Sequence, residues 1–372
     1  MLKEKEITLF KPYLKASKLY KGGKNRSQVS SEKKLYKLSS NENLLGPSPK
    51  AIAAIQEHLH SINEYPDQTD DRLQLALSNF YEGALLPGQF ITSNSGVEML
   101  ELIIRAFLDE GLECIVSEPS FEPYRVFPAK LGAIVKNVPL VGAQFELDIN
   151  GILSAITDQT RLIFVTSPNN PTGTHIPKVQ LDALIGQLPS HVVLVYDEVY
   201  FQFAQAEDYT TALPYVQDGH RVIGVNSFSK AYGLAGLRTG YAYSTPEIAQ
   251  YVSQLRRPFM LGTLVLEASI AALQDQEFIA QTVKTVNSGK TYLYGVLEEL
   301  GVQYWKSEAN FILIKPEMDP AIFEEKMLTE GVMVRPVGNF GAPGCIRVTV
   351  GTPEANEAFA RALSRVVGRF EG

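Results

Sequence analysis

Cysteine is scarce in this sequence, and long apolar runs are absent from it. The only two cysteines among 372 residues, Cys114 and Cys345, are too few for a disulfide framework and form no close-spaced metal motif. No uncharged apolar run approaches the roughly 20 residues that a membrane-spanning helix needs. The mixed-charge start Met1–Ile7 also lacks the apolar stretch of a secretory signal. We therefore expect a cytoplasmic protein without membrane contact, structural metal or disulfide bonds.

Positive charge is also in short supply. Lys and Arg total 34 against 41 Asp and Glu, so that the formal net charge is -7 at pH 7. Proteins that bind nucleic acid favour a basic surface, and we therefore expect no nucleic-acid partner. A local basic site for a small anion remains compatible with an acidic protein, because the field of a cleft depends on the charges that line it.

Short apolar runs alternate with helical patterns from Asp70 onward. The runs are rich in Val and Ile, which is typical of parallel strands covered on both faces. The expected strands are Glu113–Val116, Ala133–Val138, Leu162–Thr166, Val192–Tyr196 and Val222–Val225. Helices are expected at Lys50–His60, Asp71–Tyr81 and Val97–Leu108. This alternation predicts the α/β fold class with a largely parallel sheet.

The pattern changes past Pro258. A long helical stretch from Thr263 to about Leu300 is followed by shorter elements, which predict a smaller α+β domain. These elements are Asn310–Lys315, Pro320–Glu330, Val332–Val334, Cys345–Val350 and Glu354–Arg369. We expect a large domain at residues 41–265, a small domain at 266–372, and an N-terminal segment, 1–40, associated with the small domain.

Polar turns follow three of the predicted strands. Lys230 ends a Ser-Phe-Ser-Lys sequence, Asp197 begins Asp-Glu-Val-Tyr, and Asn170 lies in Asn-Asn-Pro-Thr-Gly. Taken singly, Lys230 could be a solvated loop lysine and Asp197 a helix N-cap. Open α/β folds bind ligands at the carboxyl ends of their strands, however, and three such turns in succession indicate one ligand-sized crevice.

A glycine-rich segment follows Lys230. The sequence Ala231–Gly240 contains three glycines and small side chains, which allow the backbone to approach a ligand closely, and Arg238 adds a fixed positive charge. Read alone, this segment would be a flexible surface loop. Its position directly after the lysine favours an anionic ligand.

These motifs, in this order, resemble those of the fold-type I pyridoxal-phosphate aminotransferases. The similarity runs from about Tyr13 to the C-terminus, and within the superfamily the chain most resembles histidinol-phosphate aminotransferases. The supporting stretches are Ser40–Asn43, Tyr65–Asp67, Glu101–Phe107 and Cys345–Thr352. The resemblance implies pyridoxal 5'-phosphate as cofactor, in a large domain with a mainly parallel sheet plus a smaller α+β domain.

The resemblance also implies a role for each matching cofactor residue. Lys230 would hold the cofactor as a Schiff base and shuttle a proton, and Asp197 would pair with the ring nitrogen. Asn170 and Tyr200 would hydrogen-bond the ring's phenolate oxygen. The remaining cofactor contacts would come from Ser95, Gly96, Val97, Ser227, Ser229 and Arg238 at the phosphate, and from Phe121 on the ring face. Tyr65 would reach the phosphate in the neighbouring subunit, which implies a homodimer.

Four further matches concern the substrate. Arg347 corresponds to the arginine that grips the substrate's acidic group, and Arg335 to a second arginine used for phosphate-bearing substrates. Tyr13 matches a tyrosine that closes over the substrate, and Asn43 lies in the loop near it. Asn43 is followed by Leu44 where the family usually has proline. The set suits histidinol phosphate as donor and glutamate or 2-oxoglutarate as its partner.

Other functions remain open at this point. An aromatic amino acid aminotransferase could use Phe121, Phe259 and Tyr13 around a phenyl ring, and a threonine-phosphate decarboxylase would share the phosphate-binding arginines. A pyridoxal-phosphate-sensing regulator would need a DNA-binding domain, for which the residues before Tyr13 are too few. A nucleotide-binding oxidoreductase is disfavoured, because the glycines follow Lys230 and do not open a G-x-G-x-x-G turn.

Overall fold

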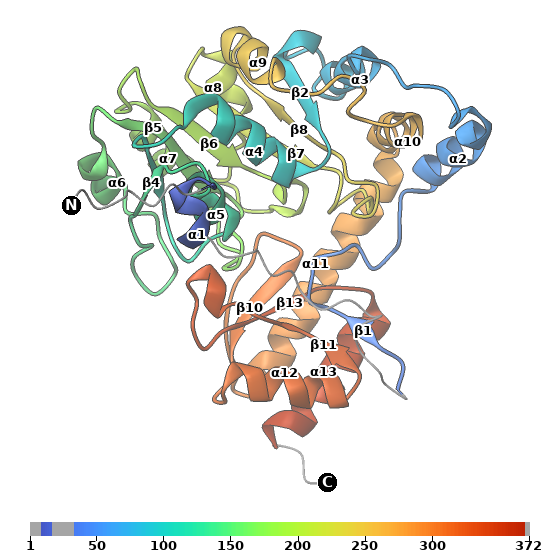
Figure 1. Cartoon of the computed structure of the whole chain (residues 1–372). Coiled ribbons are helices and arrows are strands. Elements are labelled where there is room, and N and C mark those ends of the chain that lie inside the picture. The colour runs from blue at the N-terminus through green and yellow to red at the C-terminus, as the bar shows by residue number, and fades with distance from the viewer. Residues whose placement is uncertain (1–8, 17–32, 369–372) are drawn as a thin grey trace.

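A seven-stranded sheet forms the larger part of the computed structural model, which describes residues 9–16 and 33–368 (Figure 1). The strand order is β2-β8-β7-β6-β5-β3-β4, and β8 alone runs antiparallel to its neighbours. The strands are β2 Phe90–Ser93, β3 Glu113–Val116, β4 Ile134–Asn137, β5 Thr160–Thr166, β6 Val193–Asp197, β7 Val222–Ser227 and β8 Gly240–Tyr243. The predicted α/β class with a mainly parallel sheet is confirmed.

Helices cover both faces of this sheet. Side chains of β5 and β6 alternate between two apolar clusters: Phe164 and Val195 pack with α4, α5 and α9, while Val165 and Leu194 pack with α6, α7 and α8. Burial on both faces explains why these strands are continuous apolar runs in the sequence. The helices are α4 Gly96–Phe107, α5 Pro123–Ala129, α6 Ile149–Ala155, α7 Lys178–Ile185, α8 Leu213–Gln217 and α9 Pro246–Ser253.

A four-stranded antiparallel sheet of order β12-β13-β10-β9 forms the second part. Its strands are β9 Gln303–Trp305, β10 Phe311–Lys315, β12 Arg335–Pro336 and β13 Ile346–Thr349. The long helix α11, Gln276–Glu299, joins the two parts (Figure 1). Helix α13, Pro353–Val367, packs on α11, and α12, Pro320–Thr329, packs on α13. Near the N-terminus, β1 Tyr36–Lys37 pairs in parallel with β11 Val332–Met333, which ties this segment to the C-terminal part.

The long helical pattern expected from Thr263 is two helices in the structure, α10 Thr263–Leu273 and α11. Asp275 lies at the break, almost fully buried, and its carboxylate accepts hydrogen bonds from the Ser48 hydroxyl (2.6 Å) and the Lys50 backbone N–H (3.2 Å). A buried carboxylate needs such donors, so the helix breaks where Asp275 meets the start of α2, Pro49–His58.

The remaining helices are α1 Pro12–Ala16 and α3 Asp71–Phe80. No helix in residues 9–16 and 33–368 is both long and apolar enough to cross a bilayer.

Candidate active site

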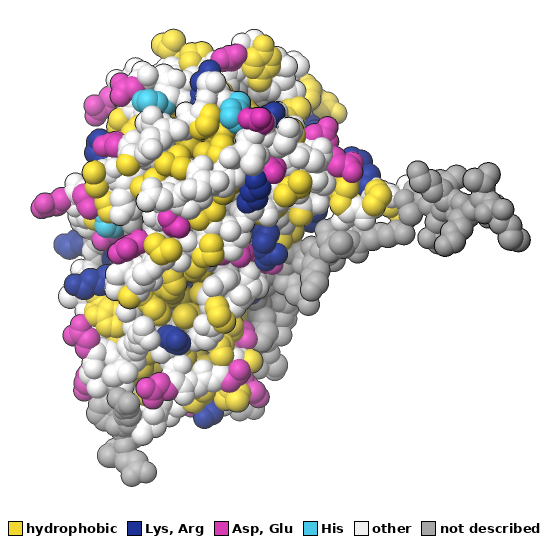
Figure 2. All heavy atoms as spheres, turned by 90° about the vertical axis from the view of Figure 1, so that its left-hand side faces the viewer, with side chains coloured by type: hydrophobic (Ala, Val, Ile, Leu, Met, Phe, Trp, Pro, Cys, Tyr) yellow, Lys and Arg dark blue, Asp and Glu magenta, His cyan; other side chains and the backbone are white. Residues whose placement is uncertain are grey.

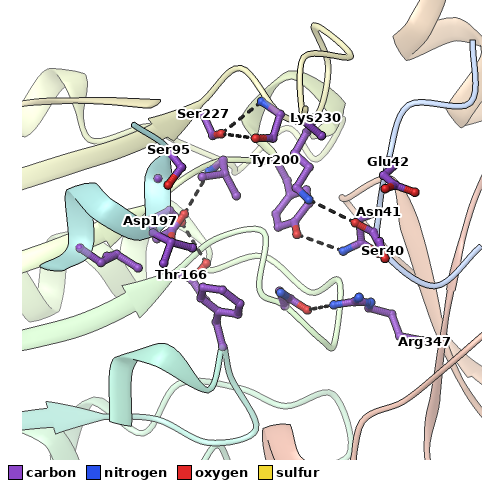
Figure 3. Close-up of a pocket in the computed structure, with 18 of the residues that line it drawn as sticks. Ser40, Asn41, Glu42, Ser95, Thr166, Asp197, Tyr200, Ser227, Lys230 and Arg347 are labelled. Carbon is purple, nitrogen blue, oxygen red and sulfur yellow. Dashed lines mark hydrogen bonds between the residues drawn. The ribbon is translucent and has the colours of Figure 1, made fainter. Parts of the chain in front are cut away.

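A cavity of about 340 Å³ opens where β5, β6 and β7 end, and the four-stranded sheet supplies its opposite wall (Figure 3). The three polar turns predicted from the sequence meet here, as expected for the carboxyl edge of a parallel sheet. Of the predicted cofactor and substrate residues, those that line this cavity are Ser95, Gly96, Val97, Phe121, Asn170, Asp197, Tyr200, Ser227, Ser229, Lys230, Arg238, Arg335 and Arg347.

Lys230 points into the cavity from the turn after β7. The Ser227 hydroxyl accepts a hydrogen bond from the Ser229 backbone N–H (3.1 Å), which tightens the turn, and the fully buried Phe228 anchors it. The Lys230 ammonium donates to the Ser40 carbonyl at 3.3 Å (Figure 3). Burial, with Arg347 adding positive charge, lowers the pKa of Lys230 to about 8. About a tenth of the amine is therefore neutral at pH 7, and about half at pH 8.

Asp197, the last residue of β6, is 5% exposed. Its carboxylate accepts hydrogen bonds from the Tyr124 hydroxyl at 2.6 Å and from the Val199 backbone N–H at 3.2 Å. Burial raises the pKa of Asp197 to about 6, and the bond from Tyr124 counteracts part of this rise. A cation brought next to this carboxylate would lower its pKa further and would itself be stabilised.

The end of the cavity at the α4 N-terminus is suited to bind an anion. The N-terminus of α4 faces it, and Ser95 caps this helix by accepting from the Glu98 N–H at 3.2 Å. Helix N-termini carry N–H groups without helical partners and a positive dipole end. The turn that leads into α4 packs so closely on β8 that a Cβ atom on Gly240 would lie 2.4 Å from the Gly96 nitrogen.

Two arginines face each other on the four-stranded sheet. Arg335 of β12 and Arg347 of β13 are directly paired across the strands, and the Phe340 ring lies within 6 Å of both guanidinium groups, at 5.9 and 5.7 Å. Arg347 is 6% exposed and donates to the Asn170 side-chain oxygen at 2.5 Å and to the Ser39 carbonyl at 3.0 Å. Like charges directly opposite in a sheet repel, so this arrangement is suited to an anion that binds both.

Three predicted site residues lie elsewhere. The Asn43 amide donates to the Ala231 carbonyl (3.0 Å) and the Thr282 hydroxyl (3.1 Å), away from this cavity. The Tyr13 ring packs on Gly132, just before β4, near the amino edge of the sheet. Tyr65 is 86% exposed, and its ring lies 5.1 Å from that of Phe259. Their roles at the site stay predictions.

Several residues of the cavity wall were not predicted as site residues. Tyr124 holds Asp197, and Asn41 donates to the Tyr200 hydroxyl at 3.0 Å. Asn41 had a signal in the sequence, because it lies two residues before Asn43 in the stretch that carried the resemblance. Tyr124 had none, because its partner Asp197 lies 73 positions away. Further unpredicted residues on the wall are Ser39, Ser40, Glu42, Leu100, Thr166, Val199, Ala235 and Phe340.

Pyridoxal phosphate fits this set of groups. The cavity offers an amine of lowered pKa, a buried carboxylate for a ring cation, and a phenol and an amide for a ring oxygen. The α4 N-terminus, Ser227, Ser229 and Arg238 gather at the anion-binding end. Among the lining residues, the cations Lys230, Arg238, Arg335 and Arg347 outnumber the anions Glu42 and Asp197, which favours negatively charged ligands.

Comparisons with known proteins show which family the chain belongs to. The family model for aminotransferase class I and II matches residues 33–363. Histidinol-phosphate aminotransferase 2 of Carboxydothermus hydrogenoformans is 38% identical over 89% of this chain and 91% of its own. A histidinol-phosphate aminotransferase of Moorella thermoacetica is 38% identical over 94% of this chain and 91% of its own.

Solved structures show the same fold. The histidinol-phosphate aminotransferase of Sinorhizobium meliloti, in complex with pyridoxal-5'-phosphate, superposes with a TM-score of 0.86 at 24% identity over 98% of this chain and 99% of its own. The aspartate aminotransferase of Thermus thermophilus with maleate gives a TM-score of 0.77 at 25% identity over 90% of this chain and 92% of its own. The chain is therefore a pyridoxal-phosphate-dependent enzyme of the class I and II aminotransferases and belongs, among them, to the histidinol-phosphate aminotransferase family.

Proposed function

We propose that the enzyme transfers the amino group of histidinol phosphate to 2-oxoglutarate. The observation that carries this proposal is the cross-strand pair of Arg335 and Arg347 on the cavity wall. A guanidinium binds a phosphate or a carboxylate through two parallel hydrogen bonds, so the pair suits a phosphate dianion in one half-reaction and the carboxylates of glutamate in the other. The names of the relatives at 38% identity support the same substrate.

The site residues divide the chemistry among them in this proposal. Bound pyridoxal phosphate supplies an electron sink for the carbanion at the substrate's α-carbon. Asp197 keeps the ring nitrogen protonated, because a buried carboxylate stabilises a neighbouring cation. Lys230 holds the cofactor, and its amine can accept and return a proton near neutral pH because its pKa is about 8.

The remaining residues orient the ligands. Asn170 and Tyr200 would hydrogen-bond the ring oxygen of the bound cofactor, and Phe121 would pack on its ring face. The α4 N-terminus, Ser227, Ser229 and Arg238 bind the cofactor phosphate. Arg347 positions the substrate, since its two hydrogen bonds to the chain already fix the guanidinium plane.

Aromatic amino acids are the main competing donors. Of the three side chains considered for a phenyl pocket, Phe121 lines the cavity, whereas Phe259 and Tyr13 do not. The geometry therefore favours the phosphorylated donor.

Assembly and location belong to the same proposal. Tyr65 is exposed and lies outside its own chain's cavity, as it would if it completed the phosphate site of a second subunit in a homodimer. Acidic and basic side chains are interspersed on the face shown in Figure 2, which has no continuous basic field for nucleic acid. We place the enzyme in the cytoplasm and place the domain boundary at residues 265–266, inside α10.

Steady-state transamination tests the proposal. Histidinol phosphate, phenylalanine, tyrosine and aspartate are compared as donors to 2-oxoglutarate, and the phosphorylated donor is expected to have the highest kcat/KM. A higher kcat/KM for phenylalanine would overturn the substrate assignment. Release of carbon dioxide without any need for a keto acid would instead identify a decarboxylase.

Arg335→Ala tests the selector residue separately. Because a phosphate dianion carries more charge than a carboxylate and gains more from a second guanidinium, kcat/KM for histidinol phosphate should fall about a hundredfold, in line with about 3 kcal/mol for a charged hydrogen-bonded contact. The half-reaction with glutamate should lose much less. Equal losses for both substrates would show that Arg335 does not select phosphate.

A further inference from the structure

Three consecutive residues, Ser39 to Asn41, each contact a different functional side chain. The Ser39 carbonyl accepts from Arg347. The Ser40 carbonyl accepts from Lys230, and the Asn41 amide donates to Tyr200 (Figure 3). The first two contacts use the main chain, which any residue could provide. The third depends on the asparagine side chain.

The position of Asn41 is strongly determined. It is 1% exposed and has a left-handed backbone with φ 55°, a conformation that asparagine tolerates better than most residues. Its N–H donates to the Thr349 hydroxyl at 2.9 Å, and its carbonyl accepts from the Asn310 amide at 3.1 Å. Asn310 directly precedes β10 and Thr349 ends β13, so the C-terminal sheet fixes the backbone of Asn41.

The side chain crosses from that sheet to the large sheet. The Asn41 Nδ2 atom lies 3.0 Å from the Tyr200 hydroxyl oxygen, and its Oδ1 atom lies 3.4 Å from the Thr349 hydroxyl. An amide nitrogen can only donate. The phenol oxygen of Tyr200 is therefore the acceptor in this bond, and its own proton is directed to a different acceptor.

We infer that Asn41 is a positioning residue, which orients the Tyr200 hydroxyl to donate a hydrogen bond to the cofactor's ring oxygen. Because the C-terminal sheet holds Asn41, the orientation of this hydroxyl depends on that sheet. The inference rests on the proposed function, in which Tyr200 binds that oxygen. A phenol that accepts one hydrogen bond becomes a stronger donor in the next, because bonds in a chain polarise one another. Stronger donation to the ring oxygen weakens that oxygen's attraction for a proton on the Lys230 nitrogen.

The test is a spectroscopic pH titration of the enzyme reconstituted with pyridoxal phosphate. Protonation of the Lys230 nitrogen that carries the cofactor changes the visible absorption band, so the midpoint is read without turnover. Asn41→Gly removes only the amide, since glycine also accepts the left-handed backbone. The charged groups that act on Lys230 stay in place in this variant: Arg347, Glu42, Arg238 and Asp197.

Asn41→Gly should raise the midpoint of the titration by about half a pH unit. A shift of this size is expected when a fraction of the free energy of one hydrogen bond is lost. Asn41→Asp should raise it further, because a carboxylate accepts the Tyr200 proton and adds negative charge. Asp also tolerates the left-handed backbone, so it serves as the second variant if the glycine form does not fold. An exposed amide deletion on α3, Asn79→Ala, is the matched control and should leave the midpoint unchanged.

A double-mutant cycle with Tyr200→Phe decides whether Asn41 acts through Tyr200. In the Tyr200→Phe background, Asn41→Gly should add no shift, because the acceptor is gone. An unchanged midpoint in Asn41→Gly with Tyr200 intact would overturn the inference, and so would an equal shift in both backgrounds. Wild-type protein that takes up no cofactor would instead refute the proposed function.

Discussion

Burial at Lys230 changes when the free amine can react. Condensation with the cofactor's aldehyde requires the neutral amine, whose fraction rises with pH through the pKa. Because that pKa is about 8 and the ordinary value is 10.5, the rate at which apoenzyme captures pyridoxal phosphate should level off above about pH 8 to 9. Stopped-flow absorbance measures this rate, and a rate still rising steeply at pH 10 would contradict the lowered pKa.

Tyr124 hydrogen-bonds the carboxylate of Asp197, which is proposed to pair with the nitrogen of the cofactor ring. Tyr124→Phe keeps the ring stacked on Phe164, with centroids 5.3 Å apart, but deletes the 2.6 Å bond to Asp197. The Asp197 pKa should then rise, and kcat should fall about tenfold, in line with the loss of one hydrogen bond to a charged group, about 1.5 kcal/mol. The fall should grow as the pH is lowered, because the loss of the Tyr124 hydrogen bond raises the Asp197 pKa and protonates the carboxylate more readily. A flat loss across pH 6 to 8 would indicate that Tyr124 acts in another way.

Site residues in local sequence motifs could be identified from the sequence, whereas residues that act through distant contacts could not. Lys230, Asp197, Asn170 and Arg347 lie in distinctive local motifs, and the structure brings them to one cavity. Tyr124 acts through a bond to a residue 73 positions away, and such a pairing has no local pattern. Asn41 and Asn43 lie in the same short stretch, and the sequence does not show which of the two side chains faces the site. The folded backbone directs the Asn41 amide to Tyr200 and the Asn43 amide away from the cavity.

At the scale of single elements, the close packing of β8 against the turn before α4 fixes the position of the proposed phosphate-binding residues. Gly240→Ala would bring a Cβ atom to 2.4 Å from the Gly96 nitrogen and 2.5 Å from the Ser95 carbonyl carbon. Backbone atoms cannot move aside as a flexible side chain can, so the turn before α4 should be displaced. This displacement should weaken binding of the cofactor phosphate. We expect the Kd for pyridoxal phosphate to rise at least tenfold, measured by absorbance titration.

Gly295→Ala in α11 provides the control for this substitution. A Cβ atom there meets nothing within 4 Å, and alanine is the better helix former. This variant should bind cofactor normally and unfold at an equal or slightly higher temperature. Normal cofactor affinity in Gly240→Ala would show that the turn tolerates displacement.

The elements themselves were predictable to different degrees. Strands β3, β5, β6 and β7 are buried on both faces and therefore appear as apolar runs. The strand β8 follows directly on the glycine-rich segment, and its small, aromatic Gly-Tyr-Ala-Tyr sequence gave no such run. The break between α10 and α11 depends on Asp275 meeting α2, a contact distant in sequence.

At the scale of the whole molecule, Lys290 supports the contact between the two parts. It lies in α11, is 6% exposed, and donates to the Ser307 carbonyl at 2.8 Å. The loop that follows meets the turn of Asn170, where the Glu308 N–H donates to the Gly173 carbonyl at 2.7 Å. Lys290 thereby links the long helix to the cofactor site.

Burial lowers the pKa of Lys290 from 10.5 to about 8. Between these pH values the unfolded chain binds more protons than the folded one, so Lys290 makes stability rise with pH across this window. Relative to Lys290→Met, wild type should gain about 2 to 3 kcal/mol in the free energy of unfolding between pH 7.5 and 10.5. Denaturant unfolding at several pH values measures the difference, and parallel curves would refute it.

The facing guanidinium groups of Arg335 and Arg347 also have a practical consequence for handling the purified enzyme. The two cations occupy directly paired positions on adjacent strands, where a multiply charged anion can bind both. Inorganic phosphate or sulfate that binds there should raise the melting temperature while competing with the phosphorylated donor. Storage in phosphate would therefore protect the enzyme, whereas assays in the same buffer would underestimate its affinity for substrate.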